Sequence, residues 1–152
     1  MEIIHGGHQY VDECVKVAEQ LPEYFTGDGV NKMRVDLVRH ELFVVRECDE
    51  ILGFASIHTK TNCVAEIPWL AIHKEHQNRG IGKQLIGYVG ESLRNKGLRL
   101  LEVKTLSWKA KYEPYEMSRR FYESMGFILL ETIDPFLEWG LENPCDIYVK
   151  IL

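Results

Sequence analysis

Apolar residues in the N-terminal third of the chain recur every three or four positions, the spacing that gives an α-helix one buried face. Residues 8–21 form one such run, which Pro22 ends, and residues 30–40 form a second, for which Asp28 can serve as the N-cap. The positions that define the two faces are Val11, Val15, Ala18, Leu21, Val30, Met33 and Leu37. The pattern therefore predicts two short helices before residue 41.

Between residues 41 and 72 the pattern changes to short runs rich in β-branched and aromatic residues. ELFVVRE (41–47) and ILGFASIHT (51–59) are separated by the acidic turn Cys48-Asp49-Glu50, which predicts an antiparallel hairpin. A third run, CVAEIPWLAI (63–72), contains Pro68, which has no N–H to donate to a sheet. Such a proline is normally confined to an edge or a bulge.

The second half of the chain alternates helical and extended patterns. A helix is predicted from Gly80 to Lys96, with Gly97 at its stop, and residues 99–106 follow as a strand, which indicates a parallel crossover. A further helix is predicted over 115–125, between Pro114 and Gly126, with Met117, Phe121 and Met125 facing inward. The last predicted strands are residues 127–133 and 145–152.

This order of elements predicts an α+β domain with one mixed, mostly antiparallel sheet of about six or seven strands and about four flanking helices. The chain has 152 residues, without repeats, low-complexity segments or a linker, so a single domain is predicted over residues 1–152. Its site is expected where the third β-rich run meets the helix that follows.

Composition narrows the possible partners. The formal net charge is -5, which disfavours nucleic acid and suits a cationic small molecule or a basic peptide. No basic N-terminal segment precedes an apolar run, and no apolar stretch approaches the roughly 18 residues of a membrane span. The four cysteines have no zinc or disulfide spacing. We expect a soluble, cytoplasmic protein with reduced thiols.

One short stretch, Gln77-Asn78-Arg79-Gly80-Ile81-Gly82-Lys83, joins the third β-rich run to its helix. Glycines let the backbone turn tightly and approach a ligand, and the first N–H groups of a helix attract phosphate. A Walker A loop is disfavoured because Gln77 replaces its first glycine and Gln84 its Ser or Thr. A dinucleotide fingerprint is disfavoured because Leu85 stands at its third glycine.

The same stretch matches the Q/R-x-x-G-x-G/A signature of the GCN5-related N-acetyltransferase (GNAT) family, through Gln77, Gly80 and Gly82. AEIPWLAI (65–72) resembles the central strand of that family, and SRRFYESMGF (118–127) resembles its F-Y-E-x-x-G-F helix and turn. The three motifs occur in the family's order. The resemblance implies a GNAT-like fold and acetyl-coenzyme A as cosubstrate, with its pyrophosphate on the glycine turn.

Two residues are the expected catalytic groups. A lysine-like amine of pKa about 10.4 is neutral only about one time in a thousand at pH 7, so transfer to it requires a base. Glu66 stands where related enzymes carry a glutamate base; alternatively it is a carboxylate paired with a neighbouring cation. The weaker substitutes for the base are Glu41, Glu102 and Glu113. Tyr122 matches the family's general acid, and its alternative is a tyrosine at the edge of the core.

The resemblance also explains Pro68, because the family's central strand is bulged and splays from its neighbour, here within residues 63–73. The pantetheine arm of the cofactor pairs in that opening, where the N–H of Leu70 would polarise the thioester carbonyl. The family often has Asn and Ala where this chain has Tyr115 and Ser118. The implied cofactor-binding residues are Leu70, Ala71, Ile72, Gln77, Asn78, Arg79, Gly80, Ile81, Gly82, Lys83, Tyr115 and Ser118.

The predicted function is direct transfer of an acetyl group from acetyl-coenzyme A to a primary amine of a small molecule or peptide, in a ternary complex. The alternative is an acyl-coenzyme A sensor or interaction module without turnover. Aromatic residues of the N-terminal helices and Trp69 are candidates for lining the acceptor site. No metal is predicted, because His73 and His76 have no third ligand nearby in the sequence. No nucleic-acid or membrane partner is expected, and a homodimer is possible.

Overall fold

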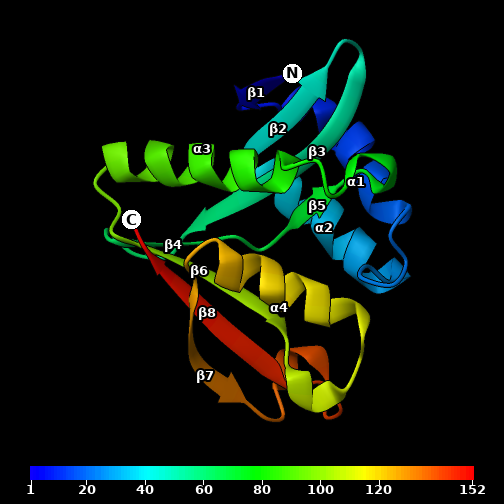
Figure 1. The fold of residues 1–152 in the computed structure, drawn as a ribbon. Coiled ribbons are helices and arrows are strands. Elements are labelled where there is room, and N and C mark those ends of the chain that lie inside the picture. The colour runs from blue at the N-terminus through cyan, green and yellow to red at the C-terminus, as the bar shows by residue number, and fades with distance from the viewer.

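The computed structural model describes residues 1–152, which form one eight-stranded sheet and four α-helices (Figure 1). The sheet order is β1-β2-β3-β4-β6-β8-β7, with β5 paired to β3 outside this path. The strands are β1 (Glu2–His5), β2 (Glu41–Glu47), β3 (Glu50–Thr59), β4 (Val64–Glu66), β5 (Leu70–Ile72), β6 (Leu100–Leu106), β7 (Ile128–Ile133) and β8 (Cys145–Ile151). The helices are α1 (Val11–Glu19), α2 (Gly27–Arg39), α3 (Ile81–Asn95) and α4 (Pro114–Ser124). The expected mixed, mostly antiparallel α+β fold is confirmed.

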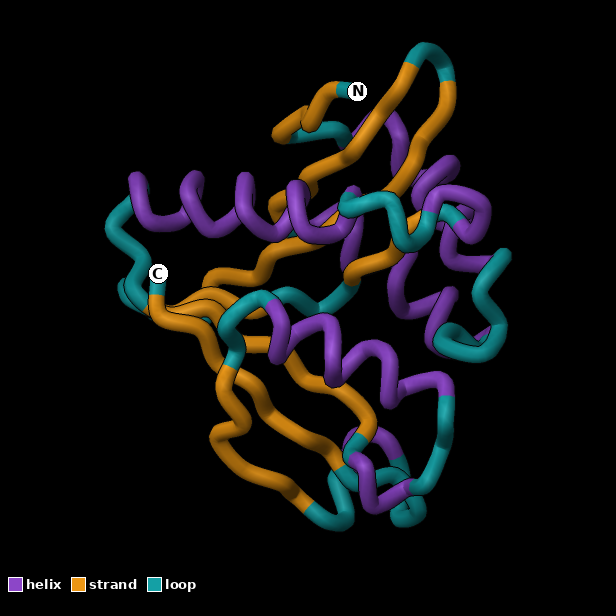
Figure 2. Tube along the Cα trace, viewed as in Figure 1, coloured by secondary structure: helices purple, strands orange, loops and turns teal.

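The predicted hairpin is β2–β3, and its register runs from Glu41 opposite Ile57 to Glu47 opposite Glu50. Strand β4 joins the two halves of the sheet, because it pairs antiparallel with β3 and parallel with β6. Figure 2 shows the N-terminal strands above and the C-terminal strands below this junction. The parallel pairing of β4 and β6 around α3 confirms the predicted crossover connection.

The run 63–72 forms two strands because the chain changes partners at Pro68. Before the proline, the N–H of Ile67 donates to the carbonyl of Glu102 on β6. After it, the carbonyl of Trp69 accepts from the N–H of Ser56 on β3, and β5 has no partner on its other side. This division, together with β1 pairing to β2, makes eight strands where about six or seven were predicted. The sheet therefore parts between β5 and β6.

Alternating residues of the β2–β3 hairpin belong to two separate buried clusters. Phe43 and Ala55 face a cluster that contains the buried side of α3, whereas Val44 and Phe54 face a cluster built with α1 and α2. Successive side chains of a strand point to opposite faces, so one hairpin can support helices on both. Helix α4 lies beside the C-terminal strands, as Figure 1 shows, and no helix has both the length and the hydrophobicity needed to span a bilayer.

Two local predictions were wrong. Thr26, not Asp28, caps α2, because its side-chain oxygen accepts from the N–H of Gly29 while Asp28 lies inside the first turn. On α4, Met117 is 59% exposed and lines the cleft, and Tyr122 is the buried residue. The reason is that the first turns of α4 border the opening between β5 and β6, whereas only its last turns pack on the core.

Candidate active site

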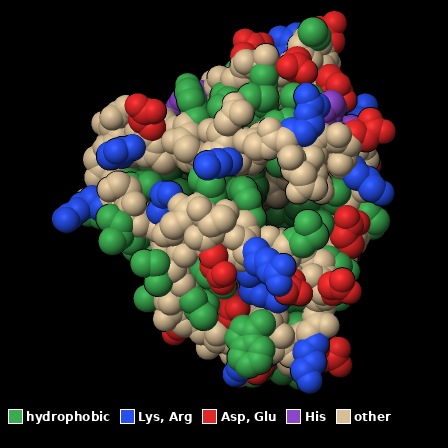
Figure 3. Space-filling model, in the orientation of Figure 1, with side chains coloured by type: hydrophobic (Ala, Val, Ile, Leu, Met, Phe, Trp, Pro, Cys, Tyr) green, Lys and Arg blue, Asp and Glu red, His purple; other side chains and the backbone are tan.

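A cleft of about 1600 Å³ lies where β5 and β6 part. Its walls come from the β4–β5 segment, the N-terminus of α3, helix α4, helix α2 and the C-terminal 3-10 helix Leu137–Trp139 (η4). Figure 3 shows a hollow on one face between α3 and α4, with Lys and Arg side chains above and below it. Nearly all the sequence-predicted site residues line this cleft; Arg79 is the exception.

The turn before α3 presents backbone N–H groups toward the cleft. Asn78 and Gly80 adopt left-handed conformations, with φ of 62° and 79°, and Gly80 is the N-cap. No side chain caps this helix, and the N–H of Gln84 is the first to bond within it, to the carbonyl of Gly80. The N–H groups of the preceding helical residues are thus free for an anion, as in other loops with alternating backbone conformation.

Gly82 brings this turn into contact with α4. A Cβ built on Gly82 would lie 3.2 Å from Cζ of Phe121 and 3.6 Å from Cγ1 of Ile72. Gln77 links the turn to β5 as well, because its Nε2 donates to the carbonyl of Ile72 at 3.2 Å. The turn is therefore held against both walls of the cleft.

The register of β5 leaves two N–H groups facing the opening. In an antiparallel ladder, hydrogen-bonded residues alternate. Trp69 and His73 bond to β3 through the carbonyl and the N–H respectively, so Leu70 and Ile72 direct their N–H groups away from β3. Ala71 pairs toward β3, and its side chain is buried in the cluster of α1 and α2. The N–H of Leu70 thus has the orientation that the oxyanion role requires.

Glu66 lies in the cleft and is paired with a cation. Nζ of Lys104 donates to Oε1 of Glu66 at 2.9 Å and lies 3.4 Å from Glu102, which also pairs with Lys60 at 2.8 Å. Burial lowers the pKa of Lys104, but the hydrogen bond and the charge of Glu66, followed by Glu102, outweigh burial and raise it. Both alternatives for Glu66 therefore describe part of its surroundings: it is paired with a neighbouring cation and it faces the cleft.

Tyr122 is 8% exposed and lies against Phe121 and Phe127, whose rings meet it edge to face. Its hydroxyl makes no hydrogen bond to another protein group, and the residue lines the cleft. Burial, and then the proximity of Tyr115, raise the pKa of Tyr122. The hydroxyl therefore stays protonated at neutral pH, as a proton donor must.

Three tyrosines tie the loop between α1 and α2 to the start of α4. The hydroxyl of Tyr115 donates to the carbonyl of Tyr24 at 2.9 Å, and the hydroxyl of Tyr24 donates to the carbonyl of Pro114 at 2.9 Å. Tyr112 adds a bond to the carbonyl of Glu23 at 2.8 Å. We call this set the tyrosine strap. The hydroxyl of Tyr115, a predicted cofactor contact, is committed to this strap, and Ser118 lies half-buried on the cleft wall.

His73 and His76 do have a third neighbour, which corrects the sequence-based expectation. The β2–β3 turn brings Glu50 to them, and one possible ligand atom from each residue lies within 4.8 Å of the others. However, Nδ1 of His73 accepts from the N–H of Glu75, and Nδ1 of His76 lies 2.6 Å from the guanidinium of Arg79. Each neutral ring then carries its proton on Nε2, which faces Glu50. Binding a metal would require both rings to change tautomer against these donors.

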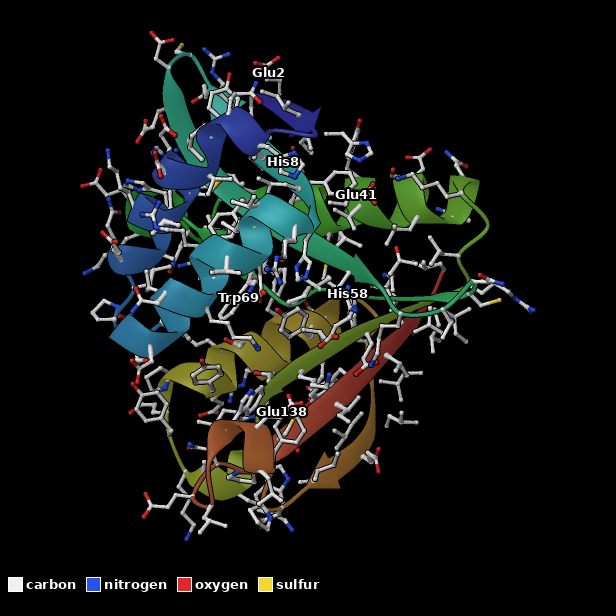
Figure 4. All side chains as sticks on the ribbon, turned by 180° about the vertical axis from the view of Figure 1, so that it is seen from behind. Glu2, His8, Glu41, His58, Trp69 and Glu138 are labelled. Atoms are coloured by element: carbon white, nitrogen blue, oxygen red, sulfur yellow. The ribbon has the colours of Figure 1, made fainter.

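The fold groups several cleft residues that lie far apart in the sequence, among them Trp69, a predicted candidate for the acceptor site. Nε1 of Trp69 donates to Asp36 of α2 at 2.8 Å, and the rings of His40 and His58 lie 5.2 Å apart between their centroids. Figure 4 shows Trp69 and His58 on the α2 side of this region and Glu138 on the opposite side. They come from α2 and its C-cap, β3, the connection between β4 and β5, and η4, so the sequence contains no spacing that could have grouped them.

Comparison with known proteins identifies the class that this fold and cleft define. Residues 39–129, which are more than half of the chain, match the acetyltransferase (GNAT) domain family. The chain therefore belongs to the GNAT family, as its three motifs predict.

Individual relatives agree with this assignment. The uncharacterized N-acetyltransferase YsnE of Bacillus subtilis is 27% identical over 128 residues, which cover 84% of this chain and 78% of YsnE. A protein of Desulfovibrio desulfuricans assigned to the GNAT family superposes with a TM-score of 0.84 at 20% identity and covers 99% of both chains. A GNAT acetyltransferase of Elizabethkingia anophelis with bound acetyl-coenzyme A gives a TM-score of 0.68 at 20% identity, over 80% of this chain and 82% of that chain. At these identities the two structures establish the shared fold.

Proposed function

We propose that the protein transfers the acetyl group of acetyl-coenzyme A to a primary amine, directly within a ternary complex. The observation that carries the proposal is the opening between β5 and β6, where free N–H groups of β5, an anion-binding turn and two candidate proton-transfer groups meet in one cleft. The relative from Elizabethkingia anophelis, which has the same fold, binds acetyl-coenzyme A, and this supports the choice of donor.

In this proposal the donor lies along β5 and across the N-terminus of α3. The N–H groups of Ile81, Gly82 and Lys83 bind the pyrophosphate, and the side chains of Arg79 and Lys83 add positive charge near it. The N–H groups of Leu70 and Ile72 pair with the pantetheine arm. The N–H of Leu70 also stabilises the oxyanion that forms on the thioester carbonyl.

Two side chains carry out the proton transfers of the reaction. Glu66 draws the proton from the acceptor amine, directly or through a water, and Lys104 fixes the position of its carboxylate. Tyr122 gives a proton to the departing thiolate, and its raised pKa keeps it protonated until then. Direct transfer needs no cysteine nucleophile, and the buried thiols Cys14 and Cys145 have pKa values raised to about 12 by burial, which keeps them unreactive.

The acceptor enters from the opposite end of the cleft, between α2 and η4. Carboxylates of Asp36, Glu138 and Glu142 line this end, so a cationic amine of a small molecule or a peptide fits it best. The aromatic rings of Trp69 and Phe25, whose centroids are 6.2 Å apart, offer an apolar wall beside Asp36.

The second candidate is a coenzyme A sensor that binds without turnover. It is favoured by the pairing of Glu66 with Lys104, since the ammonium group occupies Oε1, one of the two carboxylate oxygens that could accept the proton of an amine. The hydroxyl of Tyr122, which has no protein partner although the residue is buried and lines the cleft, favours the enzyme, because a binding module has no need of one.

The deciding experiment follows thiol release from acetyl-coenzyme A in the presence of a panel of amines, for the wild type, Glu66→Gln and Tyr122→Phe. We expect release that depends on a particular amine and falls by about 10²-fold or more in either variant. Tyr88→Phe, an exposed tyrosine on α3, is the matched control and should retain full activity. Binding of coenzyme A without thiol release for any amine would favour the sensor instead.

A further inference from the structure

Two histidines meet at the acceptor end of the cleft, next to Glu66. His40 follows α2 as its C-terminal cap, and His58 lies in β3 directly opposite Glu66 in the antiparallel register. The ring centroids of the two histidines are 5.2 Å apart, and both residues line the cleft. His58 is exposed, so this pair leads from the interior of the cleft to solvent.

The two nitrogens of His40 have different surroundings. Nδ1 is buried and has no hydrogen-bond partner. Nε2 also lacks a protein partner but is not among the buried atoms, so it is the nitrogen open to the cleft. A buried polar atom without a partner calls for an explanation, and one explanation is that the ring changes protonation during a reaction.

The groups around His40 come from several elements. Asp36 and Lys32 precede it on α2, His58 faces it from β3 and Glu66 from β4, while His8 bonds to its backbone carbonyl at 2.8 Å. Burial lowers the pKa of His40 most strongly, and the charge of Asp36 acts in the opposite direction. The ring is therefore neutral at pH 7 and able to accept a proton.

Glu66 by itself is poorly suited to keep the proton of the amine, because Lys104 already occupies its Oε1. We propose that His40 is the proton acceptor of the acetyl transfer, reached from the amine through Glu66 or a water, and that His58 passes the proton on to solvent. This inference rests on the proposed function and adds two residues to it.

The amine nitrogen forms a C–N bond to the acetyl carbon, the C–S bond breaks, and the thiolate takes a proton from Tyr122. The proton that the amine nitrogen loses goes to Nε2 of His40. The imidazolium returns it to solvent near His58, and Tyr122 regains a proton from solvent.

The test is the pH dependence of kcat/KM for thiol release, measured with an amine that the wild type acetylates. Activity requires neutral His40, so it should fall as pH drops through a midpoint below 6.5, the ordinary value for histidine. In His40→Gln this fall of kcat/KM at acid pH, the acid limb of the profile, should be absent. The rate should also be about 10²-fold lower than that of the wild type. His58→Gln should keep the limb and move it to higher pH, because His58 lowers the pKa of His40.

Two further measurements exclude a merely structural effect. His40→Ala should recover part of its rate when free imidazole is added. Coenzyme A binding and the melting temperature of His40→Gln should equal those of the wild type.

An unchanged acid limb in His40→Gln that disappears in Glu66→Gln would overturn the inference and leave the proposed function intact. If the wild type acetylates no amine, the proposed function fails and the inference fails with it. Independently of turnover, an NMR titration of the histidine rings must give His40 a midpoint below 6.5. A midpoint above that value contradicts the inference.

Discussion

Lys104 supplies the positive charge that balances the carboxylates of β4 and β6 at the cleft. It contacts two carboxylates, Glu66 and Glu102, and is only 21% exposed in its side chain. Because the pKa of Lys104 is raised in the folded protein, the stabilisation by its positive charge is complete below 10.5, the ordinary pKa of lysine, and is lost as pH rises through the higher pKa of the folded state. A charge in this position stabilises the fold at every pH at which an enzyme would work.

Replacing this lysine should therefore cost stability in a pH-dependent manner. Lys104→Met should lower the free energy of unfolding by about 2 kcal/mol at pH 7, because two carboxylates lose their shared cation. The difference in the free energy of unfolding between this variant and the wild type should become smaller above pH 10.5, where Lys104 loses its charge. Urea unfolding at pH 7 and at alkaline pH measures both values.

Lys109→Met is the matched control for this prediction. Lys109 is exposed, and its one ion pair, with Asp134, is long, at 3.9 Å. It should change the free energy of unfolding by less than about 0.5 kcal/mol. An equal loss for Lys104→Met at both pH values would mean that packing, not charge, is the cause.

Gly82 allows the anion-binding turn to approach α4. Gly82→Ala adds a Cβ 3.2 Å from the ring of Phe121, so either the turn or the ring must move. We expect coenzyme A to bind about tenfold more weakly, measured by calorimetry. Gly87→Ala, on the same helix with no atom within 4 Å of the new Cβ, should leave binding unchanged and stabilise the protein by up to about 1 kcal/mol. Equal affinity in both variants would contradict the role of the close approach.

At the scale of elements, the tyrosine strap joins the loop before α2 to the start of α4 across the cleft. The bond from Tyr115 to Tyr24 connects residues 91 positions apart in the chain. Burial raises the pKa of Tyr115 to about 12, so the strap stays intact throughout the physiological range. The strap thus connects two walls of the cleft, on the side that the proposed function assigns to the acceptor.

Removing its hydroxyl groups tests this role. Tyr115→Phe and Tyr24→Phe should each lower the free energy of unfolding by about 1 kcal/mol. The Michaelis constant for the amine should rise in both, while coenzyme A affinity stays the same, because the strap lies on the acceptor side. If coenzyme A affinity falls instead, Tyr115 contacts the cofactor, as the sequence motif suggests.

At the scale of the whole molecule, the donor in the proposed complex contacts both parts of the divided sheet. Strand β5 belongs to the N-terminal part and α4 packs on the C-terminal part, so bound coenzyme A would link them. We further propose that residues 1–152 unfold as one unit, because β4 pairs with strands of both parts.

Thermal unfolding checks this proposal. One cooperative transition is expected, and coenzyme A at 100 times its Kd should stabilise the protein by about 2.7 kcal/mol. ATP should have no comparable effect, since the glycine turn fails both nucleotide motifs. Two transitions, of which coenzyme A moves only one, would indicate two separately folding parts.

Most helices and strands of this protein follow from patterns within short stretches of its sequence. The helical spacing of apolar residues, the hairpin around Cys48 and the glycine turn before α3 depend on neighbours within a few positions, so they could be predicted correctly. The motifs also indicated the family, which residues 39–129 confirm. Of the two errors, the cap of α2 was a choice between two nearby polar residues, Thr26 and Asp28, whereas the orientation of Met117 depends on the cleft outside its own helix.

Which side chains meet in the cleft depends on how the strands and helices pack together. Lys104 is 38 positions from Glu66, and His40 reaches His58 from another element altogether. The change of strand partner at Pro68 could be predicted, because it depends on the missing N–H of that residue. Which residues the resulting opening brings together could not be predicted. Charge and hydrogen bonding act through space, whereas the periodicity of a sequence reports only the positions that one element buries.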